Sequence, residues 1–208
     1  MVGDTITRLI SPHDKSLIPI FSDCGTTTAL VFDPGGPKMD FNISSEGCDH
    51  EAIIVPQGGA REPITMDSLL YKNIEVNIER KGLHLAMKGL DVFNFSLKKV
   101  SPNVEDLIRK SVLSSSEIDY FVFHQANRLI LESISKKLKI NTSKVPTSLK
   151  YYGNTSGATI PLTIVSNLRR ENTIIDSKMV LSGFGVGLSL ASAVVDFKNV
   201  VSPEICEL

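Results

Sequence analysis

The chain has 208 residues, which is enough for one domain or for one domain and part of a second. A formal net charge of −1 gives no electrostatic case for binding nucleic acid or an anionic membrane surface. No apolar run is long enough to cross a bilayer, and the first ten residues lack the features of a signal peptide. The three cysteines are widely spaced and form no metal-type pair. We therefore expect a cytoplasmic protein with no metal site, no nucleic-acid partner and no membrane partner.

Two short apolar segments near the N-terminus predict strands. Residues 17–21 and 27–32 flank a polar turn, and short uninterrupted apolar runs are typical of strands that are buried on both faces. Residues 33–37 read DPGGP, which predicts a loop, and residues 38–82 show poor periodicity. We therefore expect a long connection with short strands over 34–82, which is either plain surface or a wall of a pocket.

Strands and helices alternate in the second half of the chain. A helix is predicted with Pro102 near its first turn, because apolar residues follow the proline at helical spacing. The remaining expected elements are, in order, a strand over 118–124, a helix over 129–138, a helix from about 158 to about 170, and strands over 179–181 and 188–195. Strands that alternate with helices predict an α/β layered domain.

Three polar or glycine-rich clusters lie where an expected strand or crossing segment ends. They are HQAN at 124–127, GNTSG at 153–157 and GFGVG at 183–187. An imidazole can donate a hydrogen bond or exchange a proton, a side-chain amide can donate to an oxyanion, and glycines let a backbone approach a ligand closely. Ligands of α/β folds collect at the carboxyl ends of strands, so the three clusters together predict a site.

Each cluster taken alone also has a purely structural interpretation. His124 would cap the helix that follows it, and Asn154 would form a turn or cap a helix. The glycines of 183–187 would make a tight turn between paired strands. A phosphate-binding loop does not fit these glycines, because neither a Lys-Ser/Thr pair nor a helix follows them.

The order of the clusters resembles the C-terminal half of 3-oxoacyl-acyl-carrier-protein synthase III. The shared pattern is strand, HQAN and helix, then YYGNTSGATIP and helix, then strand, GFGVG and strand. Further matches are MKGLDVF at 87–93, FSDCGT at 21–26 and VGD at 2–4. The resemblance covers about residues 1–33 and 83–197.

The resemblance implies a thiolase-like α/β fold made of two similar halves. Residues 1–33 would contain the last strands of the N-terminal half, and residues 34–82 would connect the halves. Residues 83–200 would form the C-terminal half, a layered αβα unit with a central mixed β-sheet.

The resemblance also implies an acyltransferase that joins acyl-CoA to malonyl-carrier protein by decarboxylative Claisen condensation, in fatty-acid or related lipid or polyketide biosynthesis. Its substrates would be acyl-CoA and phosphopantetheine thioesters, with no covalently bound cofactor. Its partners would be the acyl carrier protein and, for the intact enzyme, a second copy in a homodimer. His124 and Asn154 match the residues that donate to the thioester oxygen during decarboxylation, where loss of one donor costs about 10²–10³ in rate.

Five further residues match the family's substrate-binding positions. Gly185 and Val186 lie in the loop that would offer a backbone amide to the acyl-cysteine carbonyl. Phe93 and Ala126 match positions that line the pantetheine tunnel, and Asn127 matches a residue that contacts the pantetheine arm.

The family's nucleophilic cysteine lies upstream of the residues matched here. Cys48 lies near His50 and offers an alternative, because a Cys beside a His can form an activated thiolate. Adjacency in sequence rarely gives the required geometry, however, and no strand-to-helix elbow holds this cysteine. Cys24 is expected to be a small buried residue and Cys206 a tail residue.

Without the nucleophile, the chain alone is expected to be inactive in condensation. Met1 falls inside an expected strand rather than at a natural domain boundary, which favours a piece of a longer protein whose N-terminal half is missing here. Two alternatives remain. The gene is split and another chain supplies the cysteine half, or the chain is a non-catalytic module that binds pantetheine or the acyl carrier protein.

Overall fold

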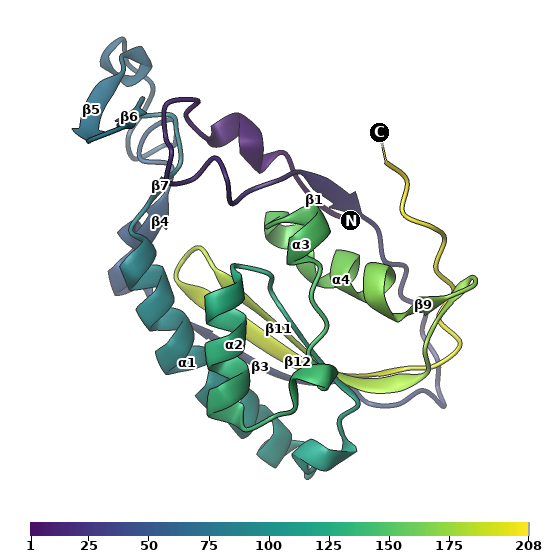
Figure 1. The fold of residues 1–208 in the computed structure, drawn as a ribbon. Helices are drawn as coiled ribbons and strands as arrows, with labels where there is room; N and C mark the ends of the chain where they lie inside the picture. The colour runs from purple at the N-terminus through teal and green to yellow at the C-terminus, as the bar shows by residue number, and fades with distance from the viewer. Residues whose placement is uncertain (208) are drawn as a thin grey trace.

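A mixed four-stranded sheet, in the order β3-β12-β11-β8, lies at the centre of the computed structural model, which describes residues 1–207. β12 (Ser189–Phe197) runs antiparallel to β3 (Asp40–Ser45) on one side and to β11 (Ser177–Gly185) on the other. β11 is parallel to β8 (Tyr120–Phe123). Figure 1 shows this sheet between helices on its two faces. The predicted α/β layered unit with a central mixed sheet is therefore confirmed.

Two helices cover one face of the sheet. α1 (Gly89–Lys110) packs on β3, β11 and β12, and α2 (Arg128–Leu138) packs on α1. Apolar side chains spaced three or four residues apart on both helices face the sheet, as an amphipathic helix requires. The main core contains the following residues: Val100, Val104, Leu107, Ile108, Phe121, Phe123, Ile130, Ile134, Val180 and Phe184. Each such side chain stabilises the fold by about 1.5–3 kcal/mol, so this layer anchors β8 and its C-terminal end.

Two shorter helices lie on the opposite face. α4 (Thr159–Leu168) packs on β8 and β11, and α3 (Leu149–Tyr152) precedes it in the chain. A second apolar cluster between α4 and the sheet includes Val122 and Met179. Within the part of the chain that the structure describes, no helix combines the length and apolar character needed to span a membrane.

Pro102 lies in the interior of α1, so the predicted start of this helix is wrong. The helix begins at Gly89, well before the proline. Proline inside a helix costs about 3 kcal/mol because it removes a hydrogen bond and crowds the preceding turn. Burial of an apolar stripe along the whole helix outweighs this local penalty. In addition, Nζ of Lys137 on α2 donates to the carbonyl of Leu97, one turn before the proline, at 2.8 Å.

The N-terminal segment contains less strand than predicted. β1 (Val2–Asp4) pairs antiparallel with β2 (Cys24–Thr26), which confirms the expected strand at 2–4. Residues 27–33 have no regular structure, and the side chains at 30–32 are each at least 80% exposed. The prediction of a buried strand there is wrong for this chain. A strand needs a hydrogen-bonded neighbour, and none of residues 1–207 supplies one.

Residues 53–87, which contain β4 to β7, form a separate lobe that extends away from the layers, as Figure 1 shows for β5 and β6. β5 (Lys72–Glu75) and β6 (Ile78–Arg80) form a hairpin, and β4 (Ile53–Ile54) pairs with β7 (Ala86–Met87). The predicted short strands over 38–82 are therefore present, although one of them, β3, belongs to the central sheet.

A buried ion pair ties this lobe to the N-terminal segment. Nε of Arg80 lies 2.5 Å from a carboxylate oxygen of Asp14, whose side chain is fully buried. Burial alone would raise the pKa of Asp14, but hydrogen bonds from Ser16 and Arg80 outweigh it and hold that pKa below its usual value. Residues 17–20 beside this pair form turns rather than the predicted strand.

Candidate functional site

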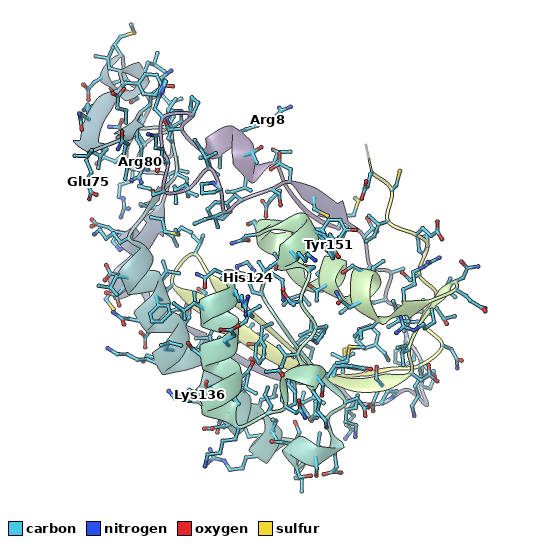
Figure 2. The ribbon with its side chains drawn as sticks, viewed as in Figure 1. Arg8, Glu75, Arg80, His124, Lys136 and Tyr151 are labelled. Atoms are coloured by element: carbon cyan, nitrogen blue, oxygen red, sulfur yellow. The ribbon has the colours of Figure 1, made fainter. Side chains whose placement is uncertain are left out.

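His124 directly follows β8, at the carboxyl end of the strand. Its backbone N–H donates to the carbonyl of Ser182 at 2.8 Å, which continues the pairing with β11. Its Nδ1 lies 2.7 Å from Oγ1 of Thr159. Its ring meets that of Phe184 edge-on, with centroids 5.4 Å apart. Figure 2 shows His124 at the end of α2 opposite to Lys136. The imidazole therefore contacts Thr159, which follows the cluster at 153–157, and Phe184, which lies in the cluster at 183–187.

The imidazole is neutral at pH 7. Burial lowers the pKa of His124 to about 4, and the nearby Ser156 carbonyl opposes this shift with a smaller effect. A neutral imidazole carries one N–H and one lone pair. Because Nδ1 is engaged by Thr159, Nε2 is the ring nitrogen left for a ligand.

Asn154 is held so that its amide nitrogen is the free group. Its Oδ1 accepts a hydrogen bond from the backbone N–H of Ser156 at 2.9 Å. The residue is only 6% exposed, and its Nδ2 has no hydrogen-bond partner within residues 1–207. Since the oxygen is already used, the carboxamide presents a donor.

The N-terminal segment braces the turn that carries Asn154. The backbone N–H of Asn154 donates to Ile20 at 3.0 Å, and the carbonyl of Asn154 accepts from Ser22 at 2.9 Å. One turn later, the N–H of Gly157 donates to a carboxylate oxygen of Asp4 at 2.9 Å. Gly153 has a φ of +62°, and a Cβ there would lie 3.2 Å from the carbonyl oxygen of Ile20. Glycine is therefore needed where the two segments approach each other.

The glycine-rich cluster lies at the hairpin between β11 and β12, as predicted, although residues 183–185 belong to β11 and only the residues after them form the tip. Gly185 pairs with Ser189 in the last ladder position. A Cβ on Gly185 would meet no atom within 4 Å, so the space before this backbone is open. Val186 at the tip is 66% exposed. The role of Gly185 and Val186 at an acyl carbonyl stays a prediction.

The remaining predicted binding residues lie on α1 and at the start of α2. Phe93 and Ala126 are partly buried and pack against the main core. Asn127 is exposed and is the N-cap of α2, where its Oδ1 accepts from the N–H of Ile130 at 2.9 Å. The structural interpretation of the HQAN motif therefore applies to Asn127, which caps the helix, rather than to His124. The contacts of these three residues with a pantetheine arm stay predictions.

The cap at Asn127 can be tested apart from any binding role. We expect Asn127→Ala to destabilise the fold by about 1 kcal/mol, because the N–H of Ile130 loses its acceptor. Asn127→Asp keeps an oxygen at the same place and should restore the stability. Urea denaturation followed by circular dichroism measures both variants. Equal stability of the alanine variant and the unaltered chain would contradict the cap.

Two residues of this site are not predicted from the sequence. Gln125 is fully buried, and its Oε1 accepts from the Thr147 hydroxyl at 2.8 Å and from the N–H of Ser148 at 3.1 Å. It therefore ties the end of β8 to the start of α3. Thr159, the partner of His124, is the other. Their only sequence signal is their position inside or beside the motifs.

The cysteines do not form a second site among the described residues. Cys48 is exposed, and Nδ1 of the nearby His50 lies 3.1 Å from the carbonyl of Gly47, with no hydrogen bond to the thiol. Cys24 is partly buried, and burial raises the pKa of its thiol, which is the opposite of activation. Cys206 is exposed in the C-terminal tail, as predicted.

The sequence and the fold have known relatives. A family model described as 3-Oxoacyl-[acyl-carrier-protein (ACP)] synthase III C terminal matches residues 108–197. A Beta-ketoacyl-[acyl-carrier-protein] synthase III of Acaryochloris marina is 30% identical over 201 residues, which are 96% of this chain and 58% of the relative. One of Lactococcus lactis subsp. cremoris is 35% identical over 198 residues, 93% of this chain and 57% of the relative. The chain belongs to the 3-oxoacyl-[acyl-carrier-protein] synthase III family.

Solved structures of the synthase III family share the fold. The crystal structure of 3-oxoacyl-(acyl-carrier protein) synthase from Burkholderia xenovorans superposes with a TM-score of 0.83 and is 34% identical. The superposition covers 97% of this chain and 56% of that one. The predicted thiolase-like αβα half is thereby confirmed. This synthase III chain spans less than three-fifths of the length of its relatives and corresponds to their C-terminal part.

Proposed function

We propose that this chain is the part of a condensing acyltransferase that carries the catalytic His and Asn. The proposed enzyme joins acyl-CoA to malonyl-carrier protein by decarboxylative Claisen condensation. One observation carries the proposal. His124 and Asn154 are each anchored through one side-chain polar atom to the turn at 154–159, which leaves Nε2 and Nδ2 without a hydrogen-bond partner among residues 1–207.

The proposed chemistry needs two neutral donors at one oxygen. When the malonyl thioester loses CO2, the electron pair of the broken C–C bond forms an enolate whose charge lies on the thioester oxygen. N–H donors that are already in place stabilise this charge without reorganisation. The neutral imidazole of His124 and the carboxamide of Asn154 have the required chemistry. The enolate carbon would then attack an acyl-cysteine carbonyl, and the cysteine thiolate would leave.

The second part of the proposal is an N-terminal half that supplies the nucleophilic cysteine. Phe41 and Ile43 on β3 are 61% and 72% exposed. They lie on the sheet face away from α1, because Asn42 between them bonds to the carbonyl of Asn103 on that helix. α4 packs on β8 and β11 on the same side and leaves β3 open. An apolar sheet face without cover is typical of an interface.

The length of the relatives agrees with such a partner. They extend well beyond this chain, which covers 58% of the relative from Acaryochloris marina. The exposed apolar side chains at 30–32 lie in a segment that has no strand neighbour among residues 1–207. We therefore propose that the missing half covers β3 and pairs with this segment.

Product analysis tests this proposal. We expect the 208-residue chain alone to form no 3-oxoacyl product from acyl-CoA and malonyl-carrier protein, because no acyl-cysteine can form beside His124. Adding an N-terminal half that carries the cysteine should yield the product. Mass spectrometry of the carrier protein measures it. Condensation product from the chain alone, at a rate above that of a sample without protein, would overturn the division of roles.

A non-catalytic binding module is the second candidate. The observation in its favour is that none of the three cysteines contacts His124 among the described residues. Release of CO2 from a malonyl thioester separates the two functions. A module would bind the thioester saturably without releasing CO2, whereas the proposed enzyme part decarboxylates it in the presence of the N-terminal half.

A further inference from the structure

Ser156 has a left-handed backbone conformation in the turn that carries Asn154. Its φ is +52°, which is unfavourable for a residue other than glycine because Cβ crowds a carbonyl oxygen. Its N–H donates to Oδ1 of Asn154 at 2.9 Å. The strained conformation therefore orients the carboxamide that the proposed function uses as a donor, and contacts with surrounding groups must hold it in place.

The peptide unit between Ser156 and Gly157 is held at both ends. Its carbonyl oxygen accepts from the hydroxyl of Thr159 at 3.0 Å, and its N–H donates to a carboxylate oxygen of Asp4 at 2.9 Å. A peptide unit is planar, so hydrogen bonds at its two ends fix its rotation and with it the backbone of Ser156. Thr159 belongs to the same stretch of chain, whereas Asp4 lies 153 positions away in the sequence.

The N-terminal segment places Asp4 against this peptide unit. Asp4 is partly buried, and it pairs with Cys24 at the end of β1. β1 packs on the short 3₁₀ helix Ser156–Ala158. A Cβ on Gly157 would lie 3.1 Å from the same carboxylate oxygen and 3.0 Å from Cγ1 of Val2, so the close approach depends on glycine. A hydrogen bond to a carboxylate is roughly twice as strong as one between neutral groups.

We propose that Asp4 is a positioning residue that keeps Ser156 in its left-handed conformation and thereby orients the carboxamide of Asn154. The inference rests on the proposed function in one respect, which is that this carboxamide donates to the enolate oxygen. Without the carboxylate, the peptide unit after Ser156 can rotate, and Ser156 relaxes to an ordinary φ. Its N–H then leaves Oδ1 of Asn154, and the carboxamide loses the hydrogen bond that fixes it.

Amide NMR of the full 208-residue chain, labelled with ¹⁵N, tests this inference. In Asp4→Ala, we expect the signals of the Ser156 N–H and the Asn154 side-chain NH2 to shift together with that of the Gly157 N–H. Asp4→Asn keeps an oxygen acceptor at the same place and should restore the signals of Ser156 and Asn154. Asn154→Asp removes the side-chain signal and so assigns it. A shift confined to Gly157 overturns the inference, because Asp4 would then hold the two segments together without acting on Asn154.

Ser156→Gly separates positioning from simple attachment of the N-terminal segment. Glycine adopts a positive φ without steric cost, so the turn then needs the carboxylate less. With an N-terminal half present, Asp4→Ala should lower kcat for malonyl-thioester decarboxylation by about 10-fold and leave KM unchanged, because the enolate charge develops only in the transition state. In the Ser156→Gly background, the same change should lower kcat by less than about threefold. Equal losses in the two backgrounds would overturn the inference.

Asp23→Ala is the matched control. Asp23 lies in the same N-terminal segment and also accepts from a backbone N–H, that of Thr7 at 2.9 Å, but its carboxylate has no hydrogen bond to the turn at 153–157 among the described residues. It should leave the Asn154 signal and kcat unchanged. The losses of Asp4→Ala repeated in Asp23→Ala would overturn a specific role for Asp4.

The unaltered chain decides the matter if Asp4→Ala does not fold, which circular dichroism checks. A positive φ brings the N–H of Ser156 close to its own Hα, so we expect a strong nuclear Overhauser effect between these two protons. A weak effect would mean an ordinary φ and would overturn the inference.

The two proposals fail separately. If no sample decarboxylates but the Asn154 signal follows Asp4, the proposed function fails while this inference stands. If Asp4→Ala decarboxylates the thioester as fast as the unaltered chain, this inference fails while the proposed function stands.

Discussion

His124→Ala and Asn154→Asp are each expected to lower malonyl-thioester decarboxylation by about 10²–10³-fold, measured as CO2 release with an N-terminal half present. Each change removes one N–H donor from the proposed enolate oxygen. Asn154→Asp is the more specific test of the two, because an aspartate oxygen can still accept from the N–H of Ser156 and so preserves the turn. The loss of rate in that variant would report the missing donor rather than a displaced loop.

A histidine outside the site provides the control for this prediction. His84 lies in the lobe, where its Nδ1 accepts from the backbone N–H of Lys81 at 3.1 Å. Burial lowers the pKa of His84 below its ordinary value, in the same direction as for His124. His84→Ala should therefore leave the rate unchanged. Decarboxylation within about threefold of the unaltered rate in either site variant would contradict the role of that donor, since such a ratio is under 1 kcal/mol in barrier height.

The stability of the fold should increase by up to about 3 kcal/mol between pH 4 and pH 6.5 because of His124. The pKa of His124 is about 4 in the folded chain and has an ordinary value of 6.5 in the unfolded chain. Between these values the unfolded state binds more protons, so protons favour unfolding. The contribution is complete above pH 6.5 and is lost as the pH falls toward 4. Each pKa unit corresponds to about 1.4 kcal/mol.

Comparison of two chains isolates this contribution. The free energy of unfolding in urea, measured at pH 4.5 and at pH 7, should differ more for the unaltered chain than for His124→Gln. Other groups titrate in both chains and cancel in the difference. An identical pH dependence for the two chains would show that the imidazole is not buried in its neutral form.

Much of the site follows from short motifs. HQAN ends a strand and GNTSG precedes a helix, and the structure brings Nδ1 of His124 and the turn of Asn154 together through Thr159 and Ser156. These motifs are local, and the strand order of an α/β layer places strand ends on one edge. The approximate bounds of β12, α2 and α4 were predictable for the same reason, because periodicity is a local property. The strand predicted over 179–181 is only the central part of β11.

Predictions of secondary structure from the local sequence were wrong where contacts with residues far along the chain decide the structure. Pro102 is a start signal in the sequence, but the apolar stripe of α1 extends far to its N-terminal side. Residues 27–32 have the composition of a strand, yet strand formation needs a neighbour that residues 1–207 do not supply. The place of β3 in the central sheet is likewise set by its pairing with β12, which lies far along the chain.

The sequence by itself determined the family and the α/β class and predicted His124 and Asn154 as site residues, because these depend on residue types at short spacing. The tertiary structure decided which atoms of those residues are free. It placed Oδ1 of Asn154 on the N–H of Ser156 and Nδ1 of His124 on the hydroxyl of Thr159, 35 positions along the chain. Hydrogen-bond partners so far apart are chosen by packing, and packing is a property of the whole fold.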